Sequence, residues 1–177
     1  FMSSGSNQRS DVYGGDVTGR VRFAKDVIEA MASAIGSGRV GFRLCPGNPY
    51  NDIDDRDPAE TAAALCEAVA PLGLAYLHIM RSPLAELDAF ALARQHSPHA
   101  LILNDGFDGP SASAALASGE GAAVSFGRHF IANPDLVERL RRGLPLSGFN
   151  RKTLYTPGPA GYSDYSTYQA NAQEVAQ

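Results

Sequence analysis

The sequence predicts an α/β fold built from four consecutive strand–helix units. Four short apolar runs begin 35, 26 and 22 residues apart, which is the spacing of βα units and is too long for hairpins. The runs are almost continuously apolar, as parallel strands covered on both faces are. We expect the strands to cover residues 39–44, 74–79, 100–104 and 122–127. The spacing alone leaves open whether they form an open sheet or half of an eight-stranded barrel.

Each expected strand is followed by a helical pattern, and one further helix precedes the first strand. The first helix covers residues 17–35 and ends at glycines. Its apolar residues, which lie on roughly one face, are Val21, Val27, Ile28, Met31 and Ile35. Caps and prolines at the first turn place the later helices. They are expected at 57–70, from Ser82-Pro83 to about 96, at 109–118, and from Asn133-Pro134-Asp135 to about 142.

The three parts of the chain form one expected domain. Residues 1–38 are a loop and a helix, 39–142 are the four βα units, and 143–177 are an irregular tail rich in Gly, Pro and Tyr that lies over the other elements. Within the tail, residues 169–172 suggest a short helix.

Composition argues against several classes of protein. The 177 residues carry 15 Lys and Arg against 19 Asp and Glu, a net charge of −4 without a basic cluster, so a nucleic-acid partner is not expected. No apolar run approaches the ~20 residues that cross a bilayer, and the first residues lack the features of a signal peptide. Two cysteines cannot build a disulfide framework or a zinc site unaided. We therefore expect a soluble cytoplasmic protein with no metal and no membrane partner.

Polar residues at the carboxyl ends of the strands are the candidates for a site, because ligands bind there in parallel α/β folds. Arg43 lies inside an apolar strand, where a guanidinium needs an anionic or carbonyl-rich partner, either a ligand or a structural ion pair. Gly127 and Arg128 follow the last strand, where a glycine admits a phosphate closely and an arginine donates paired hydrogen bonds. A simple turn is the alternative. Asp105 and Gly106 end the preceding strand, where a shared phosphate site would need them.

Ordered segments covering nearly the whole chain carry a family resemblance. They are FMSSGSNQRSDVYGG at 1–15, RVGFRLCP at 39–46, GLAYLH at 73–78, NDGF at 104–107, FGRHFIANP at 126–134 and AGYSDY at 160–165. Together they resemble the Old Yellow Enzyme family of FMN-dependent ene-reductases, the N-ethylmaleimide reductase group in particular.

The resemblance implies a TIM barrel with FMN at the carboxyl ends of its strands. Arg43 would lie at the N1/O2 edge of the flavin, where a fixed cation stabilises the anionic reduced form. Tyr155 would lie beside the substrate pocket. NAD(P)H would reduce the flavin, which would pass hydride to an activated alkene such as an enone, a maleimide or a nitro compound. The groups implied to hold the FMN phosphate are the backbone amides of Asp105, Gly106, Gly127 and Arg128, with the Arg128 guanidinium.

The resemblance covers only the second half of the family's chains, with the four strands matching strands five to eight. The family's substrate-binding pair and proton-donor tyrosine precede this half, so no catalytic residue is expected in this chain. We expect the barrel to be completed by an N-terminal half-barrel chain or by self-association. The alternative is a truncated, catalytically inactive homologue that oligomerises and binds FMN weakly or not at all.

The residues present bear on that choice. The retained Arg43, Gly127 and Arg128 favour the working enzyme. Asp105 and the missing proton donor favour the inactive homologue, since Asp105 stands where the family has glycine and a carboxylate there repels phosphate unless it turns away. His78, on the second strand, is expected to be a hydrogen-bonded barrel residue rather than a catalyst.

Overall fold

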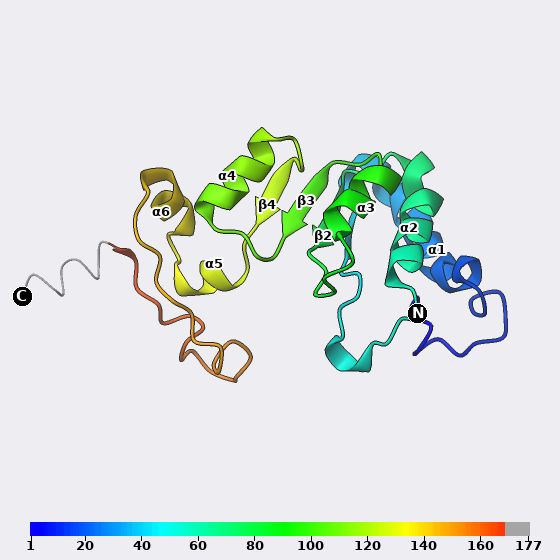
Figure 1. Ribbon diagram of the computed structural model, residues 1–177, viewed down its shortest axis with the longest axis horizontal. Coiled ribbons are helices and arrows are strands. Elements are labelled where there is room, and N and C mark those ends of the chain that lie inside the picture. The colour runs from blue at the N-terminus through cyan, green and yellow to red at the C-terminus, as the bar shows by residue number, and fades with distance from the viewer. Residues whose placement is uncertain (169–177) are drawn as a thin grey trace, which may run out of the picture. The chain divides into compact units, whose positions relative to one another are not determined.

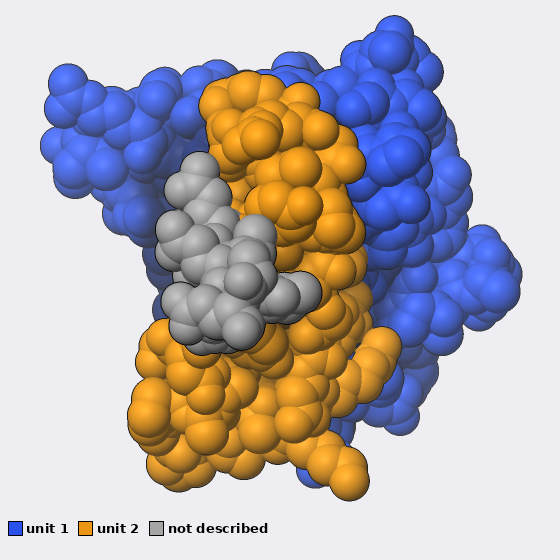
Figure 2. Space-filling model, turned by 90° about the vertical axis from the view of Figure 1, so that its left-hand side faces the viewer, with its two compact units in different colours: residues 1–125 blue, residues 126–177 orange. Residues whose placement is uncertain are grey.

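The computed structural model describes residues 1–168 and divides the chain into two compact units (Figure 1). The first unit is residues 1–125 and the second begins at residue 126, as the colours of Figure 2 show. Each unit is described by itself. The helix suggested for residues 169–172 lies outside the described residues. Within residues 1–168, no helix is both long enough and apolar enough to cross a bilayer.

The first unit is built on a parallel sheet of four strands, in the order β1-β2-β3-β4. Every neighbouring pair runs parallel, so each connection is a crossover through a helix. The α/β class and the four βα units predicted from the apolar runs are confirmed. The strands are β1 (Gly41–Leu44), β2 (Tyr76–Met80), β3 (Leu101–Asn104) and β4 (Ala123–Ser125).

The two faces of this sheet differ in polarity. Leu77, Ile79 and Leu103 are completely buried on the face against which the helices pack. The alternate residues Arg43 and His78, which are register partners, point to the opposite face and are not buried. The continuous apolar runs predicted strands covered on both faces, whereas within residues 1–125 the helices cover one face of the sheet.

Four helices follow the predicted pattern, and each begins at an aspartate. The side chains of Asp16, Asp57, Asp88 and Asp108 each accept a hydrogen bond from a backbone N–H of the first turn, a cap that contributes about 1 kcal/mol. The helices are α1 (Val17–Ile35), α2 (Pro58–Val69), α3 (Ala89–His96) and α4 (Gly109–Ala117), with short 3₁₀ turns at Ser37–Arg39, Tyr50–Asp52 and Ala70–Leu72.

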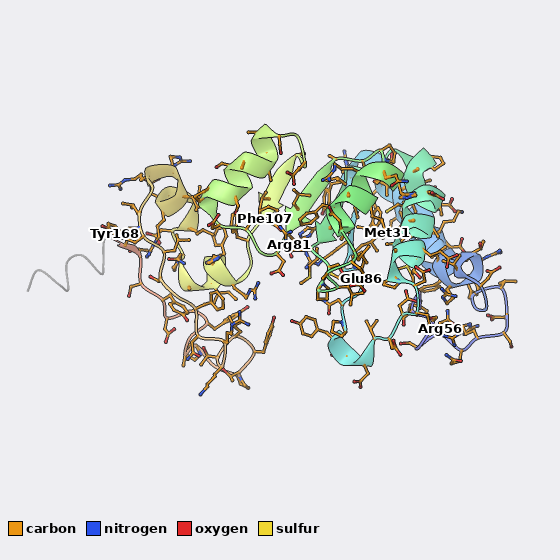
Figure 3. All side chains as sticks on the ribbon, in the orientation of Figure 1. Met31, Arg56, Arg81, Glu86, Phe107 and Tyr168 are labelled. Atoms are coloured by element: carbon orange, nitrogen blue, oxygen red, sulfur yellow. The ribbon has the colours of Figure 1, made fainter. Side chains whose placement is uncertain are left out.

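One expectation about these helices was wrong in detail. The third helix begins at Ala89 rather than at Ser82-Pro83, because the Ser82 hydroxyl accepts from the Leu84 N–H in a local turn and Asp88 supplies the cap. The apolar stripe of α1 is also wider than the face that is covered. Val21 and Ile28 are buried, whereas Val27, Met31 and Ile35 are 42–50% exposed; Figure 3 labels Met31 on this helix.

The second unit contains α5 (Arg128–Ala132), α6 (Leu136–Arg142) and the chain that follows them. The sequence predicted one helix beginning at Asn133, but the structure has two short helices separated by Asn133-Pro134-Asp135. Asn133 does not cap the second helix with its side chain. That amide is completely buried and hydrogen-bonded to His129 and Ser147 instead.

Residues 143–167, the tail of the second unit, form no helix or strand, and Arg139 holds this tail on α6. The Arg139 side chain is 2% exposed and donates from Nε to Asp135 at 2.7 Å, from Nη1 to the Pro145 carbonyl at 3.0 Å and from Nη2 to the Ser166 carbonyl at 3.2 Å. It also lies 5.8 Å from the centre of the Tyr168 ring. One buried guanidinium therefore joins two distant points of the tail to the helix.

Candidate functional site

A row of four polar side chains crosses the open face of the sheet, one from each strand. Arg43 Nη1 lies 3.1 Å from Nδ1 and 2.9 Å from Nε2 of His78. Arg43 Nη2 donates to Asn104 Oδ1 at 2.9 Å, and His78 Nε2 lies 2.8 Å from Ser125 Oγ. Asn104 Nδ2 lies 2.9 Å from the same Ser125 hydroxyl. We call these four residues the polar row.

Arg43 is held in this row by neutral groups. Its hydrogen-bond partners within residues 1–168 are the His78 ring, the Asn104 amide oxygen and the Met80 sulfur, and no carboxylate is among them. Neutral acceptors fix a guanidinium without cancelling its charge. Arg43 therefore presents an oriented positive charge toward the carboxyl end of the sheet. The sequence left open whether the partner of Arg43 is a ligand or a structural ion pair. Among the described residues, Arg43 forms no ion pair.

His78 is the hydrogen-bonded residue that the sequence predicted. Its ring is half-buried between Arg43 and Ser125. Burial and then the positive charge of Arg43 lower the pKa of the imidazole below its ordinary value. The ring is thus neutral near pH 7.

The turn after β3 has a conformation that side chains rarely adopt. Asp105 has φ 74° and Gly106 has φ 75°, both in the left-handed region that favours glycine. Arg81, directly after β2, fixes this turn by donating from Nε to the Asp105 carbonyl at 3.3 Å. A Cβ on Gly106 would lie only 3.0 Å from that Nε. Arg81 can therefore approach the turn this closely because residue 106 has no side chain.

Arg81 itself lies against a pair of stacked aromatic rings, Phe90 and Phe107. Its guanidinium carbon lies 4.8 Å from the centre of the Phe90 ring and 5.2 Å from that of Phe107; Figure 3 labels Arg81 and Phe107. Cation–π contacts of this kind restrict the guanidinium plane. The first unit therefore holds the side chain that contacts the turn at Asp105 and Gly106.

A cavity of about 760 Å³ opens beside β1. Arg43 and Cys45 line it from the strand, and Phe1, Tyr50 and Ile53 line it from the N-terminal segment and the loop after β1. The cavity is largely apolar, and β1 is an outer strand of the sheet. The sequence analysis did not predict the cavity, because its walls come from segments about 50 residues apart.

The remaining predicted site residues belong to the second unit. Gly127 is the residue before the first turn of α5, and Arg128 opens that helix with its guanidinium carbon 5.6 Å from the centre of the Phe149 ring. Tyr155 is 96% exposed in the tail. The roles of these residues, like those of Arg43, Asp105 and Gly106, stay predictions.

Comparison with known proteins places the chain in a family. Residues 1–147 match the model of the NADH:flavin oxidoreductase / NADH oxidase family. The chain belongs to this family. The resemblance to Old Yellow Enzyme found in the sequence motifs is thereby confirmed.

Individual members of the NADH:flavin oxidoreductase family match nearly the whole chain. A probable flavin mononucleotide-dependent alkene reductase of Leishmania infantum is 40% identical over 169 residues, which cover 93% of this chain and 46% of that protein. The old yellow enzyme of Trypanosoma cruzi matches with a TM-score of 0.88 at 36% identity, over 94% of this chain and 46% of that one. Morphinone reductase in complex with tetrahydroNAD matches with a TM-score of 0.84 at 37% identity, over 94% and 46%.

The chain spans about half the length of these family members. The predicted fold class is therefore confirmed as a partial barrel: four parallel βα units that correspond to one half of an old yellow enzyme. The lone arginine in an apolar run was a sufficient signal to find Arg43. Asn104 and Ser125 were missed as partners of Arg43, and Arg81 was missed because nothing in the sequence brings it to the turn after β3.

Proposed function

We propose that this chain is the C-terminal half of an FMN-dependent NAD(P)H:alkene oxidoreductase. The observation that carries the proposal is Arg43, an arginine held by neutral groups at the carboxyl end of a parallel sheet. The matched relatives include an alkene reductase described as flavin mononucleotide-dependent and a reductase bound to a nicotinamide analogue. Both facts support a flavin reduced by NADH or NADPH.

The residues present fit this cofactor. Arg43 offers a fixed positive charge, which suits the N1/O2 edge of a flavin because negative charge develops there on reduction. The left-handed backbone of Asp105 and Gly106 forms a partly exposed turn at the end of β3. The resemblance implies that the backbone amides of this turn hold the FMN phosphate. When bound, FMN supplies the hydride chemistry, accepting hydride from the nicotinamide and delivering it to an activated carbon–carbon double bond of a small electrophilic substrate.

The second unit contributes the other proposed cofactor residues. Gly127 and Arg128 stand at the start of α5, and an arginine at that position donates well to phosphate oxygens. Tyr155, exposed in the tail, is the proposed substrate contact. No catalytic residue is proposed in this chain, and the proton donor is expected in the complementary half.

Completion of the barrel follows from the edges of the sheet. The outer strands β1 and β4 each have one edge without a strand partner among residues 1–168, and exposed parallel edges favour pairing with another segment. An N-terminal half-barrel of the family is the proposed partner, since it accounts for the half of the relatives that this chain does not match. A second copy of the chain is the other way to pair both edges.

One observation favours a second reading, a truncated and inactive homologue that self-associates. Asp105 places a carboxylate at the proposed phosphate turn, in a left-handed conformation that glycine adopts without strain. A binding site for a phosphate would be weakened by this charge.

The test is alkene reduction by a completed barrel. The chain is co-expressed with the N-terminal half of the Trypanosoma cruzi old yellow enzyme, and oxidation of NADPH or NADH by a simple enone is followed. We expect enone-dependent turnover that falls about 100-fold in Arg43→Met, because removal of one preorganised charge costs a rate factor of that order.

Arg39→Met is the matched control, since Arg39 is an exposed arginine just before the same strand. It should leave turnover unchanged. A folded complex without enone-dependent turnover would contradict the proposal and favour the inactive homologue.

A further inference from the structure

The polar row has a donor–acceptor pattern that sets the protonation of its histidine. A guanidinium only donates, so Asn104 must present Oδ1 to Arg43, at 2.9 Å. That orientation turns the Asn104 Nδ2 toward Ser125, where it donates to the hydroxyl at 2.9 Å and to the carbonyl oxygen at 3.1 Å. The amide of Asn104 is thus fixed from both sides.

Ser125 completes the pattern. Its hydroxyl already accepts from Asn104, and its own proton has the Leu103 carbonyl oxygen as acceptor at 3.4 Å. His78 Nε2 lies 2.8 Å from the same hydroxyl. Arg43 Nη1 lies 2.9 Å from Nε2 and 3.1 Å from Nδ1, so it contacts both nitrogens of the ring. A guanidinium has no acceptor, so this contact favours the neutral form of His78.

We propose that His78 is a positioning residue that holds the Arg43 guanidinium for the flavin as long as its ring is neutral, and that protonation of His78 releases Arg43. This inference rests on the proposed function, because it concerns the orientation of Arg43 toward a flavin.

The surroundings of His78 support a neutral ring. From β1 the charged group that faces it is Arg43, and from β3 and β4 the facing groups are Asn104 and Ser125, which do not titrate. Tyr76 is the titratable neighbour on the same face of its own strand. A second proton would place a positive charge on a ring whose nitrogens lie 2.9 and 3.1 Å from a guanidinium nitrogen that cannot accept a hydrogen bond. Burial and Arg43 lower the pKa of His78 in agreement with this geometry.

The first test is the affinity for FMN between pH 5 and pH 8, measured by flavin fluorescence in the same two-part complex. The unsubstituted complex should bind FMN more weakly as the pH falls below 6.5. His78→Leu should bind about tenfold more weakly at pH 7.5, because Arg43 loses an acceptor. His78→Asn retains an acceptor that does not titrate, so it should restore most of the affinity and remove the histidine step. The pH dependence left in His78→Asn is that of the FMN phosphate itself.

His96→Asn is the control for any histidine titration, since His96 lies on α3 and pairs with Glu67. Its pH profile should match that of the unsubstituted complex. Equal affinity and an identical pH profile for His78→Leu and the unsubstituted complex would overturn the inference while leaving the proposed function standing.

The second test does not depend on the flavin. With ¹⁵N-histidine in this chain alone, long-range ¹H–¹⁵N spectra resolve the tautomers of its four histidines. His78 should be neutral at pH 7 and should gain its second proton only below pH 6.5, and Arg43→Met should raise the pH at which it does so. A protonated His78 at pH 7, or a titration of His78 that Arg43→Met leaves unchanged, overturns the inference. Failure of the unsubstituted complex to bind FMN contradicts the proposed function instead, and the spectra then decide the His78–Arg43 contact by themselves.

Discussion

Asn133 pairs with the backbone of Ser147 as a neighbouring strand would. Its Oδ1 accepts from the Ser147 N–H at 2.7 Å, and its Nδ2 donates to the Ser147 carbonyl at 3.2 Å. The amide is completely buried, so water does not compete for its two hydrogen bonds to Ser147. One side chain thereby fixes the start of the tail on the helices of the second unit.

Asn133→Ala should detach that start of the tail. Loss of the amide leaves the Ser147 N–H and the carbonyls of Ser147 and His129, which are half-buried residues, without this partner. Unsatisfied groups of this kind cost about 2–3 kcal/mol together. The free energy of unfolding in urea and amide hydrogen exchange over residues 143–168 measure the effect. Val137→Ala, at a position 55% exposed on α6, is the control and should change stability by less than about 0.5 kcal/mol. Unchanged exchange in Asn133→Ala would show that the tail is held elsewhere.

Acid should weaken the second unit through Asp135. Burial alone would raise the pKa of this carboxyl, but hydrogen bonds from the Tyr168 N–H and from Arg139 outweigh it and lower the pKa below the ordinary value of 3.8. The unfolded chain then binds more protons than the folded one between these two pKa values. Stability is therefore full above about pH 5 and falls as the pH drops through the lowered pKa.

Asp135→Asn isolates this contribution. It should be less stable than the unsubstituted protein at pH 7, and the difference in unfolding free energy should narrow at pH 3. An identical difference at both pH values would mean that Asp135 has an ordinary pKa in the folded state.

The sequence was a sufficient guide to the elements but not to all of their ends. Apolar runs located all four strands, and Asp57-Pro58 correctly placed the start of α2. Ser82-Pro83 and Asp88 are equally good start signals by composition. Only the tertiary structure decides between them, because the side chain of Phe90 just after Asp88 is buried.

The residues of the candidate site, too, could be predicted only in part. Arg43 could be found because a single charge in an apolar strand is conspicuous. Its partners depend on strand register, since Arg43 is level with His78 and Asn104 is level with Ser125, and register is not readable from one strand alone. Arg81 acts on a turn 24 residues away, so no local pattern predicts it.

Gly19→Ala should destabilise the protein, contrary to the usual effect of alanine in a helix. A Cβ at Gly19 would lie 2.0 Å from the carbonyl oxygen of Gly14, which is backbone and cannot turn away. We expect a loss of about 1–3 kcal/mol, the range for overpacking, instead of the gain of about 1 kcal/mol that helix propensity alone gives. Gly38→Ala is the matched control, because nothing lies within 4 Å of a Cβ there. Thermal unfolding of both variants decides the sign, and a stabilised Gly19→Ala would refute the packing argument.

Substitution of Asp105 separates its charge from its backbone conformation. Asp105→Asn removes the carboxylate and should tighten FMN binding several-fold in the completed barrel, because a charge opposing the phosphate is removed. Asp105→Gly removes the same carboxylate and also adopts φ 74° without strain. It should be more stable than Asp105→Asn by about 0.5–1 kcal/mol. Fluorescence titration with FMN and thermal unfolding provide the two values. Weaker FMN binding by both variants would place Asp105 among the residues that help to hold the cofactor.

The visible absorption spectrum of the completed barrel after dialysis tests the central claim most directly. A flavin-binding half-barrel should retain about one FMN per complex, and Arg43→Met should lose most of the flavin band while Arg39→Met keeps it. A complex that is folded by circular dichroism yet colourless, and that stays colourless after FMN is added and dialysed again, would contradict the account. The family membership would then describe the ancestry of the chain and not a flavin-dependent activity.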